Sequence, residues 1–243
     1  MGYPYIAIGS TPLIDLRSDT VAADSLLSGI TAHDKNGNPI VGTVESVPWD
    51  ALASHALSGF ATGQSTSIHG AAFMYWSGIT GASFPLCRTI GNSAFMYCST
   101  MSTVSFPVCT WVGLSAFYGC YALSSVYLPV CSYANNGAFY ACSSLTEIEM
   151  PMLESVTNSM FNGCIGLETA SFPVASVVNN SAFARCSNLQ SVYLMSTSMA
   201  TLSNSNAFSS THASLKIYVP SSLYSQYISA ANWSYFSSRF VSA

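Results

Sequence analysis

The sequence predicts a repeat solenoid with a period of 22 residues and a parallel β-sheet along one face. Three series of residues predict it, because phenylalanines, prolines and cysteines each recur 22 positions apart. The series are Phe73, Phe95, Phe117, Phe139, Phe161 and Phe183; Pro85, Pro107, Pro129, Pro151 and Pro173; and Cys98, Cys120, Cys142, Cys164 and Cys186. A fixed period between about 20 and 50 residues is typical of stacked repeats, in which neighbouring coils bury each other's apolar sides.

One repeat runs from Leu123 to Ser144 and reads LSSVYLPVCSYANNGAFYACSS. At its start, Leu123, Val126 and Leu128 lie on the apolar side, while Ser125 and Tyr127 alternate outward. This period-two pattern with β-branched and aromatic residues predicts a short strand. Pro129 should end this strand, because proline cannot continue a central ladder. The AFxxC part is expected to form a short helical turn that packs Ala and Phe inward. A tight turn with positive φ is predicted at the slot that Gly and Asn share, namely Gly91, Gly113, Asn135 and Asn179.

A second cysteine series has the same period and comprises Cys87, Cys109 and Cys131. It continues as Leu153 and Ala175, and Trp76 precedes the first series at the equivalent position. Because these three residues neither form disulfides nor bind metal, the slots are predicted to be apolar core positions filled by free cysteines. Stacked side chains also point in parallel, which is poor geometry for a disulfide. Disulfides and a metal site are the alternatives, although the spacing contains no zinc-type CxxC or Cys–His pair.

The repeat unit, L-x-x-V-x-(L/F)-P-x-C-x-x-(I/V)-G-x-x-A-F-x-x-C-x-x, resembles the BspA-like leucine-rich repeat, a class of bacterial and phage-encoded proteins. The resemblance implies an α/β-type leucine-rich repeat domain over residues 79–214, serving as a scaffold for a ligand. A sixth copy at Leu189 has Met195 in the proline slot and is three residues longer before its NAF. Residues 57–78 look like a degenerate first copy. The five regular copies begin at Ile79, Met101, Leu123, Leu145 and Leu167.

The last segment, residues 215–243, resembles the C-terminal cap of the same repeat class. Ser221 or Ser222, directly after Pro220, is a residue type that caps the N-terminus of a helix. The apolar pattern after it predicts a helical cap over the last coil, with core positions at Leu223, Tyr227, Ala231, Trp233, Phe236 and Phe240.

The first segment, residues 1–46, holds many of the few charged residues. Its sequence from Asp19 to Val44 predicts a short helix ending at Gly29 and then a hairpin that turns at Asn36-Gly37. This stretch resembles a motif of phage tail-fibre and other tail proteins, and that resemblance implies a small α+β attachment module. A plain N-terminal cap for the first coil is the alternative. Residues 47–78 are expected to form the junction and the degenerate first repeat.

Composition excludes several functions. Only 7% of the 243 residues are charged and the net charge is −4, which gives no electrostatic basis for binding nucleic acid. No apolar run approaches the ~18 residues of a membrane helix, so membrane insertion is not expected. The N-terminal stretch has no secretory-signal pattern, so either the sequence is that of a mature protein or the protein is not exported by that route. The sequence contains no nucleophile elbow, P-loop, HExxH or GxGxxG, and its four histidines are scattered. It therefore predicts a non-enzymatic protein without cofactor or metal.

The outward positions of the predicted strands are the candidate binding surface. They are rich in hydroxyl groups, with two tyrosines and one acidic repeat, which suits a glycan through ring stacking and hydrogen bonds or a protein through tyrosine anchors. A solvated sheet face without a ligand is the alternative, and calcium at the glutamates of the fourth copy is another. The candidate ligand-binding residues are Tyr127, Glu147, Glu149, Ser171 and Tyr193.

The functional prediction from these resemblances is a phage tail-fibre or tail-tip protein that binds the host bacterial surface. Residues 1–46 would contact other tail or virion proteins, and the protein is expected to be a homo-oligomer located in the virion. Two alternatives remain: an adhesin of the bacterial cell surface, and a purely structural virion or decoration protein.

Overall fold

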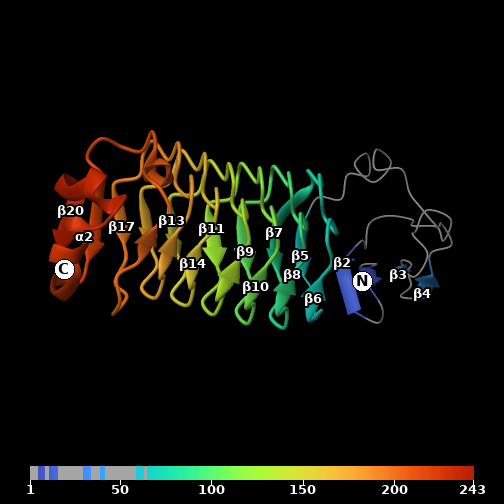
Figure 1. Ribbon diagram of the computed structural model, residues 1–243. Coiled ribbons are helices and arrows are strands. Elements are labelled where there is room, and N and C mark those ends of the chain that lie inside the picture. The colour runs from blue at the N-terminus through green and yellow to red at the C-terminus, as the bar shows by residue number, and fades with distance from the viewer. Residues whose placement is uncertain (1–4, 9–10, 16–29, 34–38, 42–58, 63–64) are drawn as a thin grey trace.

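The computed structural model describes residues 5–8, 11–15, 30–33, 39–41, 59–62 and 65–243, with side chains at Ala61 and from Ser65 onward. Residues 65–243 form a stack of coils with short helices at its C-terminal end (Figure 1). This arrangement confirms the predicted repeat solenoid.

Each coil contributes one strand to a first row, in which adjacent strands are parallel. Residues 22 positions apart lie side by side, as Ser125 does with Thr103 and Tyr127 with Ser105. The row begins with β5 (Gly59–Thr62) and ends with β19 (Lys216–Val219) and β20 (Phe240–Ser242). Between them lie β7 (Ile79–Ser83), β9 (Thr103–Ser105), β11 (Ser125–Tyr127), β13 (Glu147–Glu149), β15 (Thr169–Ser171) and β17 (Ser191–Tyr193).

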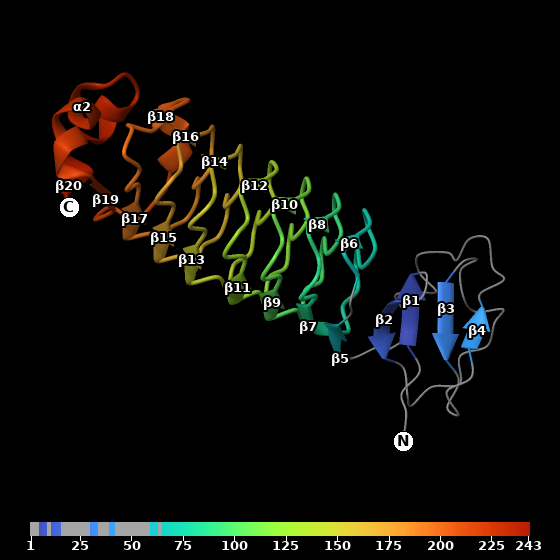
Figure 2. The ribbon, with the colours of Figure 1, turned by 90° about the horizontal axis from the view of Figure 1, so that it is seen from below.

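A second row of two-residue strands runs along another side of the stack, as Figure 2 shows. Its strands are also parallel and in the same register, so that Trp111 lies beside Thr89 and Tyr133. The strands are β6 (Ser67–Ile68), β8 (Thr89–Ile90), β10 (Trp111–Val112), β12 (Tyr133–Ala134), β14 (Ser155–Val156), β16 (Val177–Val178) and β18 (Thr201–Leu202).

Both rows are interrupted at the same junction, between β11 and β13 and between β12 and β14. The third side of the stack continues across this junction, because the Phe139 N–H donates to the Met160 carbonyl at 3.0 Å. The Ala141 N–H likewise donates to the Asn162 carbonyl at 2.8 Å. Beside the second strand row, the Glu154 N–H also donates to the Ser132 carbonyl at 3.1 Å, so backbone hydrogen bonds join the two halves there as well.

The AFxxC segment of each coil consists of successive hydrogen-bonded turns, so the prediction of a helical turn was wrong. The Cys98 N–H donates to the Phe95 carbonyl within the segment at 3.1 Å. The Phe95 N–H instead donates to the Ala116 carbonyl of the next coil at 2.8 Å. Alternate N–H groups thus point along the stack, and the next coil satisfies them, which a helix within one coil would prevent.

The prediction of positive φ at the slot of Gly91, Gly113, Asn135 and Asn179 was also wrong. Left-handed residues occupy two other slots, two and six residues later, and most of them are not glycine. Bonds to the next coil therefore hold non-glycine residues in a conformation that they rarely adopt alone. The first slot holds Ala71, Ser93, Ser115, Gly137, Ser159 and Ser181, and the second holds Tyr75, Tyr97, Gly119, Ala141, Gly163 and Arg185.

Glycine at the predicted turn slot has a different cause, which is close approach of the backbones of adjacent coils. A Cβ on Gly113 would lie 2.6 Å from the backbone nitrogen of Asn92, and one on Gly91 would lie 2.4 Å from that of Gly70. In later coils a polar side chain takes this slot, and those of Thr157 and Asn179 bond back to the preceding coil. The Thr157 hydroxyl, for example, donates to the Ala134 carbonyl at 2.9 Å.

The core of the stack is a column of phenylalanine rings that continues from coil to coil. Successive centroids are 4.9 to 5.5 Å apart and successive planes differ by at most 11°. The column absorbs the three extra residues of the sixth copy, because Phe208 stacks on Phe183 at 5.3 Å. Its members are Phe73, Phe95, Phe117, Phe139, Phe161, Phe183 and Phe208.

All eight cysteines are buried free thiols, which confirms the core prediction for both cysteine series. In the first series each thiol donates to the carbonyl of the phenylalanine 25 residues earlier, as from Cys120 to Phe95 at 3.0 Å. In the second series each thiol donates to a carbonyl two residues later, as from Cys109 to Trp111 at 3.3 Å. The small S–H group therefore fills an apolar slot and also satisfies a backbone acceptor.

The C-terminal cap is less helical than predicted. It contains η3 (Ser221–Leu223), α2 (Tyr224–Ser229) and η4 (Trp233–Arg239), and another short helix, η2 (Ser205–Phe208), lies in the sixth copy. Neither Ser221 nor Ser222 caps a helix, because Pro220 is the N-cap of η3 and no side chain bonds there. Among the predicted core positions, Tyr227, Trp233, Phe236 and Phe240 are buried and cover the last coil.

The described parts of the N-terminal segment form an antiparallel sheet in the order β2-β1-β3-β4. Its strands are β1 (Tyr5–Ile8), β2 (Thr11–Asp15), β3 (Ile30–His33) and β4 (Pro39–Val41). β3 and β4 pair where the hairpin was predicted, with Thr31 opposite Val41. The predicted helix ending at Gly29 and the turn at Asn36-Gly37 lie outside the described residues.

Replacing Gly113 with Ala should lower the free energy of unfolding by about 3 kcal/mol, because the new Cβ meets backbone that cannot move without breaking the stack. The matched control is Gly137→Ala, whose Cβ meets no atom closer than 3.5 Å. The control should cost only about 1 kcal/mol, for the left-handed conformation. Urea unfolding of both variants measures the difference, and equal losses would contradict the role of close backbone approach.

The buried thiols should make the protein less stable in alkali. Burial raises the pKa of the Cys98 thiol from 9.0 to about 12, and that of the Cys186 thiol likewise. The folded state thus keeps protons that the unfolded chain loses, so the stabilisation is complete below pH 9.0 and is lost as the pH rises towards about 12. Urea unfolding across this range should show the decline. The double variant Cys98→Ala, Cys186→Ala should show a shallower decline, and an unchanged slope would contradict the assignment.

Candidate functional site

The five predicted binding residues lie on the outward side of the first strand row, and we call this surface the binding face. Three of them form one line across adjacent strands, because Glu149 pairs with Ser171 and Ser171 with Tyr193. Glu147 lies in the neighbouring line, beside Thr169. Tyr127 lies on β11, on the other side of the interruption between β11 and β13.

Tyr127 is the most accessible ring of the binding face, with 54% of its surface exposed. Its strand neighbour is Ser105, a small hydroxyl residue that leaves space beside the ring. Within the described residues no other aromatic ring stacks on Tyr127. The exposed half of its surface is therefore available to a ligand.

Glu147 and Glu149 project from the same strand, and both are exposed. Two carboxylates two residues apart on a strand point to the same side of a sheet. They provide hydrogen-bond acceptors beside the row of hydroxyl groups that includes Thr169 and Ser171.

β19 adds two side chains to the binding face that the sequence prediction missed. Lys216 pairs with Ser191 and Tyr218 with Tyr193, and the two tyrosine rings stack at 4.5 Å. The alternation of Leu215, Ile217 and Val219 is a strand signal that could have identified them. Tyr193 is thus half of an aromatic pair, whereas Tyr127 stands alone.

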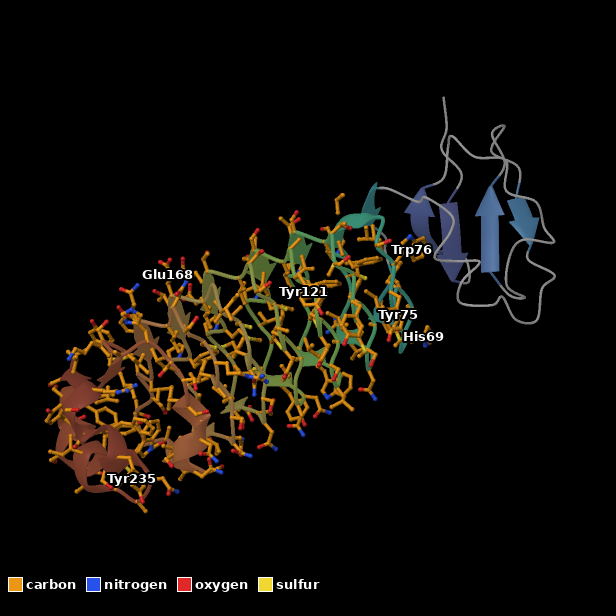
Figure 3. All side chains as sticks on the ribbon, turned by 90° about the horizontal axis from the view of Figure 1, so that it is seen from above. His69, Tyr75, Trp76, Tyr121, Glu168 and Tyr235 are labelled. Carbon is orange, nitrogen blue, oxygen red and sulfur yellow. The ribbon has the colours of Figure 1, made fainter. Side chains whose placement is uncertain are left out.

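A second group of tyrosines lies along the turn segments of successive coils, and we call it the tyrosine ladder. Its members are Tyr75, Tyr97, Tyr118, Tyr121 and Tyr140. Figure 3 labels Tyr75 near its start and Tyr121 further along. Its rings pack mainly on one another, with Tyr75 stacked on Tyr97 at 5.2 Å and Tyr118 on Tyr140 at 4.5 Å. Burial and a hydrogen bond with Tyr97 raise the pKa of Tyr118. These contacts pack the rings of adjacent coils on one another, while Tyr75 and Tyr121 remain 51% and 46% exposed.

Arg185 ends the tyrosine ladder. Its guanidinium donates to the Tyr140 hydroxyl at 2.6 Å and to the Asn162 side-chain oxygen at 3.1 Å. The three residues come from successive coils, so two donors of the exposed Arg185 guanidinium link its coil to the two coils before it.

The described histidines and glutamates show no arrangement for metal binding. In the described part of the chain, no three His, Cys, Asp or Glu side chains gather as a metal site requires. His69 is exposed at the first coil, and His212 makes a local contact of 2.7 Å with the Ser214 hydroxyl. Among the helices that the structure describes, none has the length and apolar character to cross a bilayer.

Two solved structures share the fold with TM-scores above one half. The pneumococcal vaccine antigen PcpA has a TM-score of 0.53 and 14% identity, over 69% of this chain and 41% of that chain. A leucine-rich repeat protein of Eubacterium ventriosum has a TM-score of 0.52 and 16% identity, over 70% of this chain and 52% of that chain. A leucine-rich repeat protein of T. pallidum has a TM-score of 0.49 and 18% identity, over 62% and 85%. A search of curated proteins finds no match.

A family model also matches the sequence itself. The model describes the BspA type leucine-rich repeat region, in six copies, and it matches residues 66–189 and 110–235. These two matches together cover more than half of the chain and coincide with the coils that the structure shows. They begin after the N-terminal segment, so they do not bear on its resemblance to phage tail proteins. The chain belongs to the BspA type leucine-rich repeat family.

Proposed function

We propose that this protein is a non-enzymatic adhesin of a bacterial cell surface, and that its binding face recognises a glycan. The observation that carries the proposal is the ring of Tyr127, which is 54% exposed beside Ser105, while Glu147 and Glu149 are exposed on β13, the first-row strand of the next coil. An aromatic ring with free faces next to hydrogen-bond acceptors is the combination that a sugar ring requires.

The ring and the carboxylates have different parts in this proposal. The apolar face of a sugar would stack on Tyr127, which excludes water from both surfaces. Glu147 and Glu149 would accept hydrogen bonds from sugar hydroxyls, and bonds to charged acceptors are stronger than those between neutral groups. Ser171 and the stacked Tyr193 would extend the contact along the same line of the sheet.

The scaffold suits recognition, because the core and the binding face are made by different positions of each coil. The outward positions of the strands can change from coil to coil, whereas the phenylalanine and cysteine slots face the core and are filled by apolar side chains. A pneumococcal protein of this fold is described as a vaccine antigen, which fits a surface location.

A phage tail-fibre role is the second candidate. It rests on the resemblance of residues 1–46 to tail proteins, which would make this segment the contact to other tail or virion proteins. The family match over residues 66–235, together with the pneumococcal vaccine antigen of the same fold, supports the adhesin as the first candidate. Both of the first two roles would use the same binding face.

The proposal can be tested by binding of the full chain to an array of purified bacterial surface polysaccharides, followed by titration calorimetry with a polysaccharide that binds. Tyr127→Ala should weaken binding about tenfold, since a stacked ring contributes roughly 1 kcal/mol or more. The double variant Glu147→Gln, Glu149→Gln should weaken it by a similar factor, through loss of charged acceptors.

The matched control is Tyr235→Ala, which removes an equally large ring that is 75% exposed on the C-terminal cap. It should bind as the parent protein does. Failure to bind any polysaccharide, or equal affinity of the Tyr127 variant and its parent, would reject this face as a glycan site.

A further inference from the structure

An exposed apolar stripe runs along the stack at the corner between the two strand rows. In each of five successive coils, the residue after the proline of the 22-residue series is a large apolar residue. These side chains are between 36% and 51% exposed. We call this the corner stripe, and its members are Leu86, Val108, Val130, Met152 and Val174. Five adjacent apolar side chains at one corner are more than the isolated exposed residues that are normal for a soluble protein.

The second strand row widens this apolar surface near its middle. Trp111 on β10 and Tyr133 on β12 project outward from adjacent coils and stack with centroids 6.3 Å apart. Tyr133 is 41% exposed. The two rings lie three residues after Val108 and Val130, so the widest part of the surface is at these two coils.

Two opposite charges flank this surface at symmetrical distances from its centre. Arg88 and Glu154 occupy the same slot, two residues after the corner stripe, and both are exposed. Arg88 is one coil before the Trp111 coil and Glu154 is one coil after the Tyr133 coil. The other members of the slot are the uncharged Thr110, Ser132 and Ser176.

We propose that this surface is where two copies of the chain associate, antiparallel, about a two-fold axis between the coils of Val108 and Val130. Such an axis places Val108 against the partner's Val130 and Trp111 against the partner's Tyr133. It also places Arg88 against the partner's Glu154, and by symmetry Glu154 against the partner's Arg88. Apolar contacts then lie at the centre and one ion pair lies at each end.

The charges select this register among those that the even spacing allows. The coils of both copies repeat at the strand spacing of about 4.8 Å. The stripes of two partners therefore match over their whole length only when both partners have the same coil-to-coil spacing. Moving the copies by one coil would place Arg88 opposite an uncharged residue of the slot. A parallel arrangement about a two-fold axis would place Arg88 opposite the partner's Arg88 and Glu154 opposite the partner's Glu154. A second copy is therefore the occupant that fits both the spacing and the charges.

The experiment is sedimentation equilibrium of the full chain over a range of concentrations. The parent should form a reversible dimer, because the surface is narrow compared with those of obligate dimers. Arg88→Glu alone, and Glu154→Arg alone, should each raise the dimer dissociation constant about tenfold or more, since like charges then face each other. The double variant Arg88→Glu, Glu154→Arg should restore the dissociation constant of the parent.

Val130→Glu tests the apolar centre and should give a monomer. Its control is Leu114→Glu, which replaces another exposed apolar side chain away from this surface and should leave the dimer intact. Circular dichroism of each variant checks that the fold is kept. A parent that is monomeric at every concentration, or a double variant no better than the single ones, would overturn the proposal.

Discussion

Hydrogen bonds that run along the stack, from each coil to the next, are the constraint on which the rest of the structure depends. They join both strand rows and the turn segments, so a coil without neighbours would leave many backbone groups without partners. The same bonds hold residues such as Ser93 and Ser115 in the left-handed region. Adjacent backbones consequently lie so close that Gly91 and Gly113 leave no space for a Cβ.

The period of these bonds also determines the core. Because equivalent residues lie directly over one another, each phenylalanine stacks on its counterpart and each thiol of the first cysteine series reaches a carbonyl of an earlier coil. The column tolerates the longer sixth copy, since Phe208 still reaches Phe183. Where the strand rows are interrupted, this column and the turn segments remain continuous. Core and surface are thus separate, and outward residues such as Tyr127 and Val130 are free to serve recognition and association.

The sequence was sufficient to predict the features that repeat. The spacing of the phenylalanines, prolines and cysteines predicted the solenoid and the buried thiols. It also predicted that the candidate ligand-binding residues lie on the same side of the first strand row. It was insufficient where a property depends on the neighbouring coil: Ser115 has no intrinsic preference for positive φ, and the turn segments carry a pattern that also suits a helix. Lys216 and Tyr218 were missed because the strand that carries them lies beyond the last regular copy. The open ring of Tyr127 and the stacked ring of Tyr193 look alike in sequence, and only their neighbours distinguish them.

The central claim, that coils stack in a register of 22 residues, is tested most directly by deleting one whole repeat. Removing residues 123–144 joins Ala122 to Leu145 at equivalent positions, so every slot keeps its place and Phe117 can stack on Phe161. The account predicts that this shorter chain folds and unfolds cooperatively in urea, as judged by circular dichroism. Removing residues 123–143 instead shifts every later slot by one position, and this chain should fail to form the complete stack. Equal stability of the two shortened chains would contradict the account.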